Sequence, residues 1–139
     1  MEIIEEILET SRINAGKVVS ISNTVKEDQI LDNLNAIIQE RAREAGINVP
    51  VIAGIMPITS PKQLGRSVAM SGTDVPQRFR AIVDFFGENP PAMLQAGIVY
   101  ATEQIIDLLA NGIRHIHVYT MNKPEVAGGI MKNLSEILR

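Results

Sequence analysis

The pattern of hydrophobic and polar residues divides this chain into short apolar runs separated by longer amphipathic segments. The central run, Val49–Met56, has no alternation of polar and apolar residues. Such a run is typical of a parallel strand that is covered on both faces. Shorter apolar runs at 17–22 and 113–121 predict two further strands. We expect any ligand site near the carboxyl end of the central strand, where α/β proteins usually bind their ligands.

The amphipathic segments predict helices, because their apolar residues recur every three or four positions. The helix after the central strand has clear start signals. Ser60 can cap it, Pro61 suits its first position, and Gln63 occupies the Glu/Gln position of a capping box. Glycines or asparagines follow several of the segments and mark their ends. The predicted helices span residues 2–13, 24–46, 61–70, 75–86, 92–110 and 124–138.

The predicted order of elements is α-βα-βαα-βα, which places the chain in the α/β class. Strands that alternate with helices form parallel sheets with right-handed crossovers. Residues 1–139 therefore read as one domain, either half of a TIM-type (β/α)8 barrel or an open flavodoxin-like sheet. A three-stranded sheet leaves two edges with unpaired backbone groups. We expect either a homo-oligomer that associates through these edges or a piece of something larger.

Composition excludes several classes of function. The formal net charge of −3 gives no electrostatic basis for binding nucleic acid. No apolar run approaches the roughly 20 residues that span a bilayer, and the acidic start does not resemble a signal peptide. We therefore expect no membrane partner and a cytoplasmic protein. With no cysteine there is no thiolate nucleophile or metal ligand, and two Tyr and three Phe leave few rings to stack on a ligand.

Three motifs, in order along the chain, resemble methylenetetrahydrofolate reductase. The first is Gly-Ile-Met-Pro-Ile-Thr at 54–59 followed by Lys-Gln at 62–63. The second is Gly-Ile-Val-Tyr-Ala-Thr-Glu-Gln at 97–104, and the third is His-Val-Tyr-Thr-Met-Asn-Lys at 117–123. With Arg-Ala-Arg-Glu-Ala-Gly-Ile at 41–47, the resemblance covers residues 41–138. Residues 1–40 match only in their pattern of helix, strand and helix, so an origin elsewhere and an engineered chimera stay open.

The resemblance implies a β/α barrel that binds a flavin and reduces a methylene-folate with electrons from a nicotinamide cofactor. The matching segment corresponds to the C-terminal part of that family. The family's flavin-binding and acidic catalytic residues lie mainly in its N-terminal half. We therefore expect no catalytic residue and no cofactor on this chain alone, and FAD only where a complete reductase site is assembled.

The resemblance also supplies candidates for binding a folate. They are Gln63, Ser71, Tyr119, Lys123 and, near the end of the first strand, Asn23. The chain departs from the family at two positions. Ser67 stands where the family tends to place an aromatic ring that stacks on a ligand. Lys123 stands where the family often has Arg, and lysine lacks the planar fork that binds carboxylates in a bidentate manner.

Several of these residues also have purely structural interpretations. Gln63 can cap its own helix, and Tyr119 can be a core residue with a satisfied hydroxyl. Asn122 is expected to cap the last helix. His115 and His117 lie on one face of a strand, but no third metal ligand stands nearby in the sequence, so we do not predict a zinc site.

Three hypotheses about function follow. The first is a C-terminal half-barrel that resembles methylenetetrahydrofolate reductase but has no independent catalysis, as a fragment or an engineered scaffold would. The second is a subunit of a flavin-dependent reductase whose site is completed by a partner or by self-association. The third is a folate-binding module of weak affinity.

Overall fold

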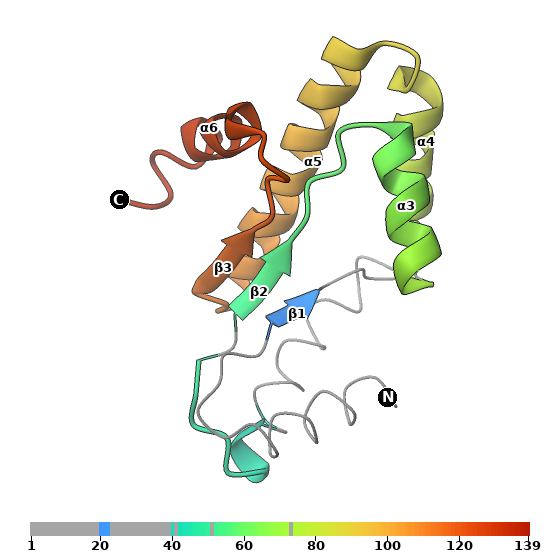
Figure 1. The fold of residues 1–139 in the computed structure, drawn as a ribbon. Helices are drawn as coiled ribbons and strands as arrows, with labels where there is room; N and C mark the ends of the chain where they lie inside the picture. Colours follow the sequence, from blue (N-terminus) through green and yellow to red (C-terminus); the bar gives the residue numbers. More distant parts are fainter. Residues whose placement is uncertain (1–19, 23–39, 41, 51, 73) are drawn as a thin grey trace.

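The computed structural model describes residues 20–22, 40, 42–50, 52–72 and 74–139 (Figure 1). The predicted helix at 2–13, most of the helix at 24–46 and the candidate Asn23 lie outside these residues. The described strands are β1 (Ser20–Ser22), β2 (Ile52–Ile55) and β3 (His115–Val118). The described helices are α3 (Pro61–Ser71), α4 (Gln77–Phe86), α5 (Pro90–Ala110) and α6 (Pro124–Asn133).

The three strands form one parallel sheet in the order β1-β2-β3. Ala53 of β2 stands opposite Ile21 of β1 and Ile116 of β3. The crossover from β2 to β3 contains α3, α4 and α5 (Figure 1). This arrangement confirms the predicted α/β class and the parallel strands. The strand order is sequential, as it is for successive strands of a β/α barrel.

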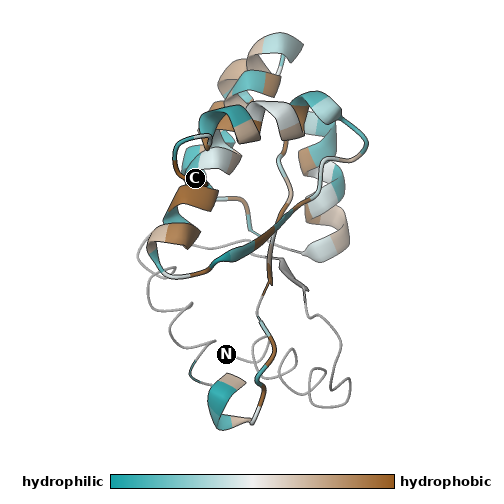
Figure 2. Ribbon diagram, turned by 90° about the vertical axis from the view of Figure 1, so that its left-hand side faces the viewer, coloured by the Kyte–Doolittle hydropathy of each residue, from teal (hydrophilic) through white to brown (hydrophobic). Residues whose placement is uncertain are grey.

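The main hydrophobic core lies between one face of the sheet and the helices α5 and α6. Alternate residues of each strand point to opposite faces, and Ala53 and Ile55 of β2 point into this core together with the half-buried Ile116 and Val118 of β3. The helices mix hydrophobic and hydrophilic residues, as amphipathic helices do (Figure 2). The buried helical and loop residues of the core are Ala101, Ile105, Leu108, Ile113, Val126, Ile130 and Leu134.

A second, smaller core joins α4 to the first part of α5. Its buried members are Phe79, Val83 and Met93, and Met93 has no exposed surface. The half-buried residues around it include Leu64, which is its contact with α3. No residue of α3 is itself buried. Helix α3 therefore lies at the margin of this core.

The helix boundaries follow the local signals in the sequence closely. Helix α3 begins after Ser60, whose hydroxyl accepts a hydrogen bond from the Gln63 N–H, and ends at Gly72, which has a left-handed conformation with φ of 62°. Helix α5 begins after Asn89, whose side chain accepts from the Ala92 N–H. Residue 46 is also a left-handed glycine, with φ of 74°, just after the helical residues 42–44. The ends of α3 confirm the prediction made from Ser60 and Gly72, whereas α5 begins at Pro90, earlier than the predicted start at residue 92.

The predictions for the last strand and helix need correction. Asn122 does not cap α6, because it has a left-handed conformation with φ of 62° and Lys123 holds the N-cap position. Helix α6 ends at Asn133, earlier than predicted. Ile137 and Leu138, which the prediction included in this helix, lie beyond its end and are each about half exposed, at 49% and 50%. Leu134, which follows the last residue of α6, is the last buried residue of the described chain.

Met131 of α6 is 57% exposed, so not every apolar residue of the last helix faces the core. Strand β3 is shorter than the apolar run at 113–121. Ile113 is buried but belongs to the turn that closes α5, where its N–H donates to the carbonyl of Leu108.

Among the described residues, no helix is long and apolar enough to cross a membrane.

Candidate functional site

The candidate site lies at the carboxyl ends of β2 and β3, in the loops that lead into α3 and α6. Both helices begin at this edge of the sheet, so the positive ends of their dipoles are near it. The loop from Met56 to Ser60 contains Thr59, whose side chain is 6% exposed. Thr59 is one of two buried polar residues among those described, the other being Thr102 in α5.

Gln63 holds the loop that precedes its own helix. Its side-chain oxygen accepts hydrogen bonds from the Thr59 N–H, at 3.0 Å, and from the Thr59 hydroxyl, at 3.3 Å. Its side-chain nitrogen donates to the carbonyl of Pro57, at 2.9 Å. The arrangement extends a capping box by one residue, because the side chain reaches Thr59 and not the cap residue Ser60. The structural interpretation of Gln63 is confirmed, and one N–H of its amide is left over for a ligand.

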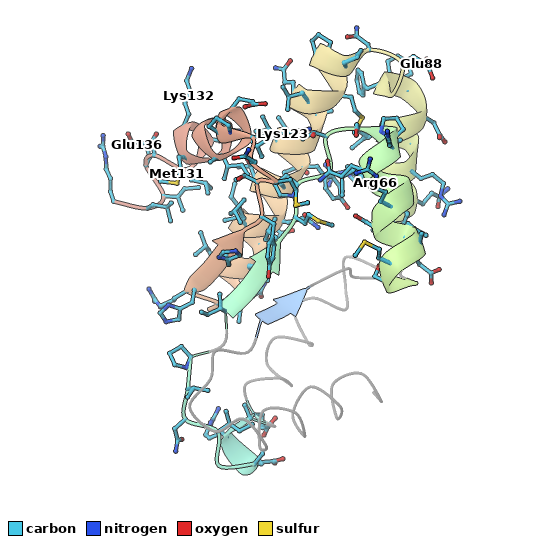
Figure 3. The ribbon with its side chains drawn as sticks, viewed as in Figure 1. Arg66, Glu88, Lys123, Met131, Lys132 and Glu136 are labelled. Atoms are coloured by element: carbon cyan, nitrogen blue, oxygen red, sulfur yellow. The ribbon has the colours of Figure 1, made fainter. Side chains whose placement is uncertain are left out.

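Lys123 connects the ends of the two strands. Its ammonium donates a hydrogen bond to the hydroxyl of Thr59, at 3.0 Å, across 64 positions of sequence. Figure 3 shows Lys123 where the chain passes from β3 to α6. The three side chains form one series of hydrogen bonds, in which Lys123 donates to Thr59 and Thr59 donates to Gln63. Within the described part of the chain, no carboxylate pairs with Lys123.

Tyr119 lies just beyond the last residue of β3. Its N–H donates to the carbonyl of Ile55, at 2.8 Å, so the sheet continues for one more backbone bond. Its ring meets that of His117 edge to face, with centroids 4.5 Å apart and planes at 74°. The side chain is 36% exposed, so Tyr119 is not a core residue. The ring lies on the sheet face opposite to the main core, and Tyr119 and Lys123 both follow the carboxyl end of β3.

The two histidines of β3 are exposed on the sheet face opposite to the main core. His115 stands beside Ile52, and His117 stands beside Gly54, which has no side chain to cover it. In the described ranges no group of three or more His, Asp or Glu side chains could hold a metal ion.

Ser71 does not join the other candidates. It is the last residue of α3, and its hydroxyl donates to the carbonyl of Ser67, at 2.6 Å. Eight residues separate it from Gln63, which corresponds to about 12 Å along a helix. The structure thus brings together Gln63, Lys123 and the strand end that carries Tyr119. Asn23 lies outside the described residues.

Sequence reasoning missed two residues that shape this edge. Thr59 was read only as part of a motif, although a polar residue in an otherwise apolar segment is a signal of a buried hydrogen bond. Gly97 of α5 lets the helix lie directly against the loop. A Cβ atom at this position would collide with the carbonyl of Ile58 and would lie 3.3 Å from Cα of Thr59. The sequence gives no direct sign of this close approach.

The cavity beside the loop that precedes α3 is too small to hold a flavin. Pockets that hold drug-sized ligands or cofactors have volumes of about 300–1,000 Å³. This cavity measures about 90 Å³. Around the described strand ends there is also no glycine-rich loop that could hold a pyrophosphate.

Comparison with known proteins agrees with the motifs. The family model for methylenetetrahydrofolate reductase matches residues 10–135. A methylenetetrahydrofolate reductase (NADH) 1 of Arabidopsis thaliana is 38% identical over 95 residues, which are 68% of this chain and 16% of that protein. Methylenetetrahydrofolate reductase 1 of Schizosaccharomyces pombe is 32% identical over 75% of this chain and 17% of its own length.

The bacterial relatives are shorter, but the chain still spans only part of them. The 5,10-methylenetetrahydrofolate reductase of Escherichia coli is 26% identical over 69% of this chain and 32% of its own length. The family match also begins at residue 10, so it includes most of the segment that we matched only in pattern. The chain therefore spans at most about a third of these relatives' lengths. It belongs to the methylenetetrahydrofolate reductase family.

Proposed function

We propose that this chain forms the folate-binding side of a methylenetetrahydrofolate reductase site and does not catalyse the reduction by itself. Its strands form one wall of a β/α barrel, a half-barrel whose other strands lie outside the described residues. The family match and the sequential parallel strands support this arrangement. The observation that carries the proposal is the series of hydrogen bonds from Lys123 through Thr59 to Gln63, at the edge where barrel enzymes bind their substrates.

Lys123 is the residue that we assign to an anionic group of the substrate. An ammonium has three donors, and only one is used by Thr59. The first N–H groups of α6 follow directly and have no side-chain cap. Ammonium and helix terminus together favour a negative charge. The glutamate tail of a folate carries such carboxylates, and no described acidic side chain competes for the ammonium.

Gln63 and Tyr119 have positioning and contact roles. Both polar ends of the Gln63 amide bind the loop, so its main effect is to hold Thr59 in place for Lys123. Tyr119 presents a partly exposed ring on the open face of the sheet. An aromatic ring of this kind can lie against the flat ring system of a folate. Ser67 offers no such ring, which predicts weak binding by this chain alone.

FAD would supply the redox chemistry of the reduction where a complete reductase site is assembled. In this proposal the chain's own residues bind and orient the folate, and the rest of the family's barrel holds the FAD. The alternative is that a partner chain or a second copy of this chain, joined through the sheet edges, completes the site. Gel filtration distinguishes the two cases, because only the alternative requires an assembly that retains FAD.

The test measures folate binding and turnover separately. Calorimetric titration with methyltetrahydrofolate should show saturable binding, which Lys123→Met weakens by roughly 10- to 100-fold, the usual effect of losing a charge-assisted hydrogen bond. Lys132→Met is the matched control, since this lysine is exposed in the last turn of the same helix (Figure 3). Lys123→Arg should retain binding, because arginine presents a bidentate fork to carboxylates.

Turnover is assayed with added FAD, NADH and methylenetetrahydrofolate, beside a full-length reductase as the positive control. We expect none from this chain. Turnover by the purified chain would overturn the claim that it does not act alone. If the Lys123→Met and Lys132→Met variants bound folate with equal affinity, Lys123 would not be the residue that binds the substrate.

A further inference from the structure

The chain passes from β3 to α6 through a turn whose two central residues have left-handed conformations. Met121 has φ of 52° and Asn122 has φ of 62°, and the N–H of Lys123 donates to the carbonyl of Thr120, at 3.1 Å. Two successive positive φ angles closed by such a bond are the features of a type I′ turn. Among the described residues other than glycine, only these two have positive φ, so this conformation is confined to the turn that leads into Lys123.

The two central residues are not equally suited to this conformation. Asparagine tolerates it better than most residues, whereas the Cβ atom of methionine crowds the following carbonyl oxygen. Met121 is 64% exposed, so burial of its side chain offsets little of this cost. The turn is therefore not one that Met121 favours by itself, and it depends on Asn122 and on the contacts at either side.

Hydrogen bonds on both sides of the turn attach it to β2 and to the loop that follows β2. On the β3 side, the Tyr119 N–H donates to the Ile55 carbonyl, at 2.8 Å. On the α6 side, the Lys123 ammonium donates to the Thr59 hydroxyl, at 3.0 Å (Figure 3). Strained backbone conformations persist where the surrounding structure fixes them in this way. Because the turn reverses the chain within two residues, Tyr119 and Lys123 both reach the segment that begins at Ile55.

We infer that Asn122 is a positioning residue of the proposed folate site, because its left-handed conformation brings Lys123 to Thr59. A residue with a branched Cβ at this position would favour negative φ, open the turn and move the ammonium away from Thr59. This role of Asn122 rests on the role proposed for Lys123. The position of the ammonium can nevertheless be measured without a folate.

The first measurement follows the Lys123 side chain by NMR in the absence of folate. The protein carries ¹³C at the lysine Cε atoms, and the signal of Lys123 is identified by its loss in Lys123→Met. We expect two inequivalent Cε protons, because the bond to Thr59 restricts the side chain. In Asn122→Val they should merge, as in the exposed Lys132. In Asn122→Gly they should stay distinct, because glycine adopts positive φ freely.

The second measurement is the calorimetric affinity for methyltetrahydrofolate. Asn122→Val should weaken binding about tenfold, as the loss of a charge-assisted hydrogen bond would. Asn122→Gly should stay within about twofold of the parent protein. In a Lys123→Met background, Asn122→Val should cause no further loss, because both changes act through one contact. A purely structural role of Asn122 would not predict this dependence on Lys123.

Asn111→Val is the matched control. Asn111 follows α5 with a negative φ of −93°, and its side chain donates to the Asp107 carbonyl, at 2.9 Å. Its replacement should lower Tm by about 4 °C through the lost bond and leave the folate affinity unchanged. If Asn122→Val does not fold, Asn122→Ala takes its place, with a loss of affinity of about threefold, since alanine is not branched at Cβ.

Three results would overturn the positioning role. The first is a Lys123 signal that stays the same in Asn122→Val. The second is a signal that merges in Asn122→Gly as it does in Asn122→Val. The third is a loss of affinity from Asn122→Val that is equally large in the Lys123→Met background. If the parent protein binds no folate, the proposed function fails, and the Lys123 signal still decides whether Asn122 positions the ammonium.

Discussion

Helices α3 and α5 both contact the loop at residues 56–60, α3 as its continuation and α5 through Gly97, yet they are held in opposite ways. Helix α5 buries six residues, among them Met93 at 0% and Leu108 at 2% exposure, and contributes to both cores. Helix α3 buries none, and its Met70 is 88% exposed. What fixes α3 is a set of local hydrogen bonds at its start, from Ser60 and Gln63. Burial therefore stabilises the scaffold, and capping positions the segment beside the candidate site.

The first test of this comparison removes apolar side chains from the two regions. Leu108→Ala in α5 should lower the free energy of unfolding by about 2–5 kcal/mol, because it leaves a cavity in the main core. Leu64→Ala in α3 should cost only about 1 kcal/mol, because that side chain is half exposed before the change. Urea unfolding followed by circular dichroism measures both. Equal losses would show that α3 belongs to the core after all.

The second test concerns the place where the two regions touch. Gly97→Ala should destabilise the protein by about 1–3 kcal/mol, because its methyl group collides with the Ile58 carbonyl and pushes α5 from the loop. Gly128→Ala is the matched control. This glycine also lies in a helix, but nothing stands within 4 Å of an added Cβ, so the change should stabilise by about 0.5–1 kcal/mol.

The Gly97 variant should also alter the site, which thermal stability alone does not show. Displacement of Thr59 breaks its bond to Lys123, so folate affinity should fall in Gly97→Ala and stay constant in Gly128→Ala. Thermal unfolding and calorimetry measure the two effects. An alanine tolerated at 97 with unchanged affinity would show that the loop can yield without disturbing the site.

The sequence predicted those features that depend on nearby residues. The ends of α3 follow from Ser60 and Gly72, and the parallel sheet follows from the alternation of apolar runs with helices. It did not predict where α6 ends, because that depends on how far the core extends beneath Leu134. Ile137 and Leu138 are as hydrophobic as the buried positions, so their pattern alone could not distinguish them.

The candidate site was predictable to a smaller extent. The family motifs pointed to Gln63, Tyr119 and Lys123, and the capping box anticipated how Gln63 is used. The contact between Lys123 and Thr59 was not foreseen, since it joins residues 64 positions apart and depends on the register of β2 with β3. The approach of Gly97 to the loop likewise depends on the packing of α5, which no local pattern encodes.

The smallest effects come from removing helix caps. They test most directly whether α3 opens by itself while α5 opens only together with the cores. Ser60→Ala and Asn89→Ala each delete a side chain that accepts a backbone N–H at a helix start, at 3.2 Å in α3 and 3.3 Å in α5. Each change should cost about 1 kcal/mol of helix stability. Because α3 buries no residue, its amides should exchange with solvent roughly fivefold faster in Ser60→Ala while those of α5 and α6 stay unchanged.

In Asn89→Ala the same loss should be shared across the molecule, because α5 cannot open without exposing both cores. Amides of α4, α5 and α6 should then exchange faster together. Hydrogen exchange followed by NMR measures both variants under one set of conditions. If Ser60→Ala accelerated exchange throughout the sheet, α3 would be part of the cooperative core, and local capping would not be what separates the site segment from the scaffold.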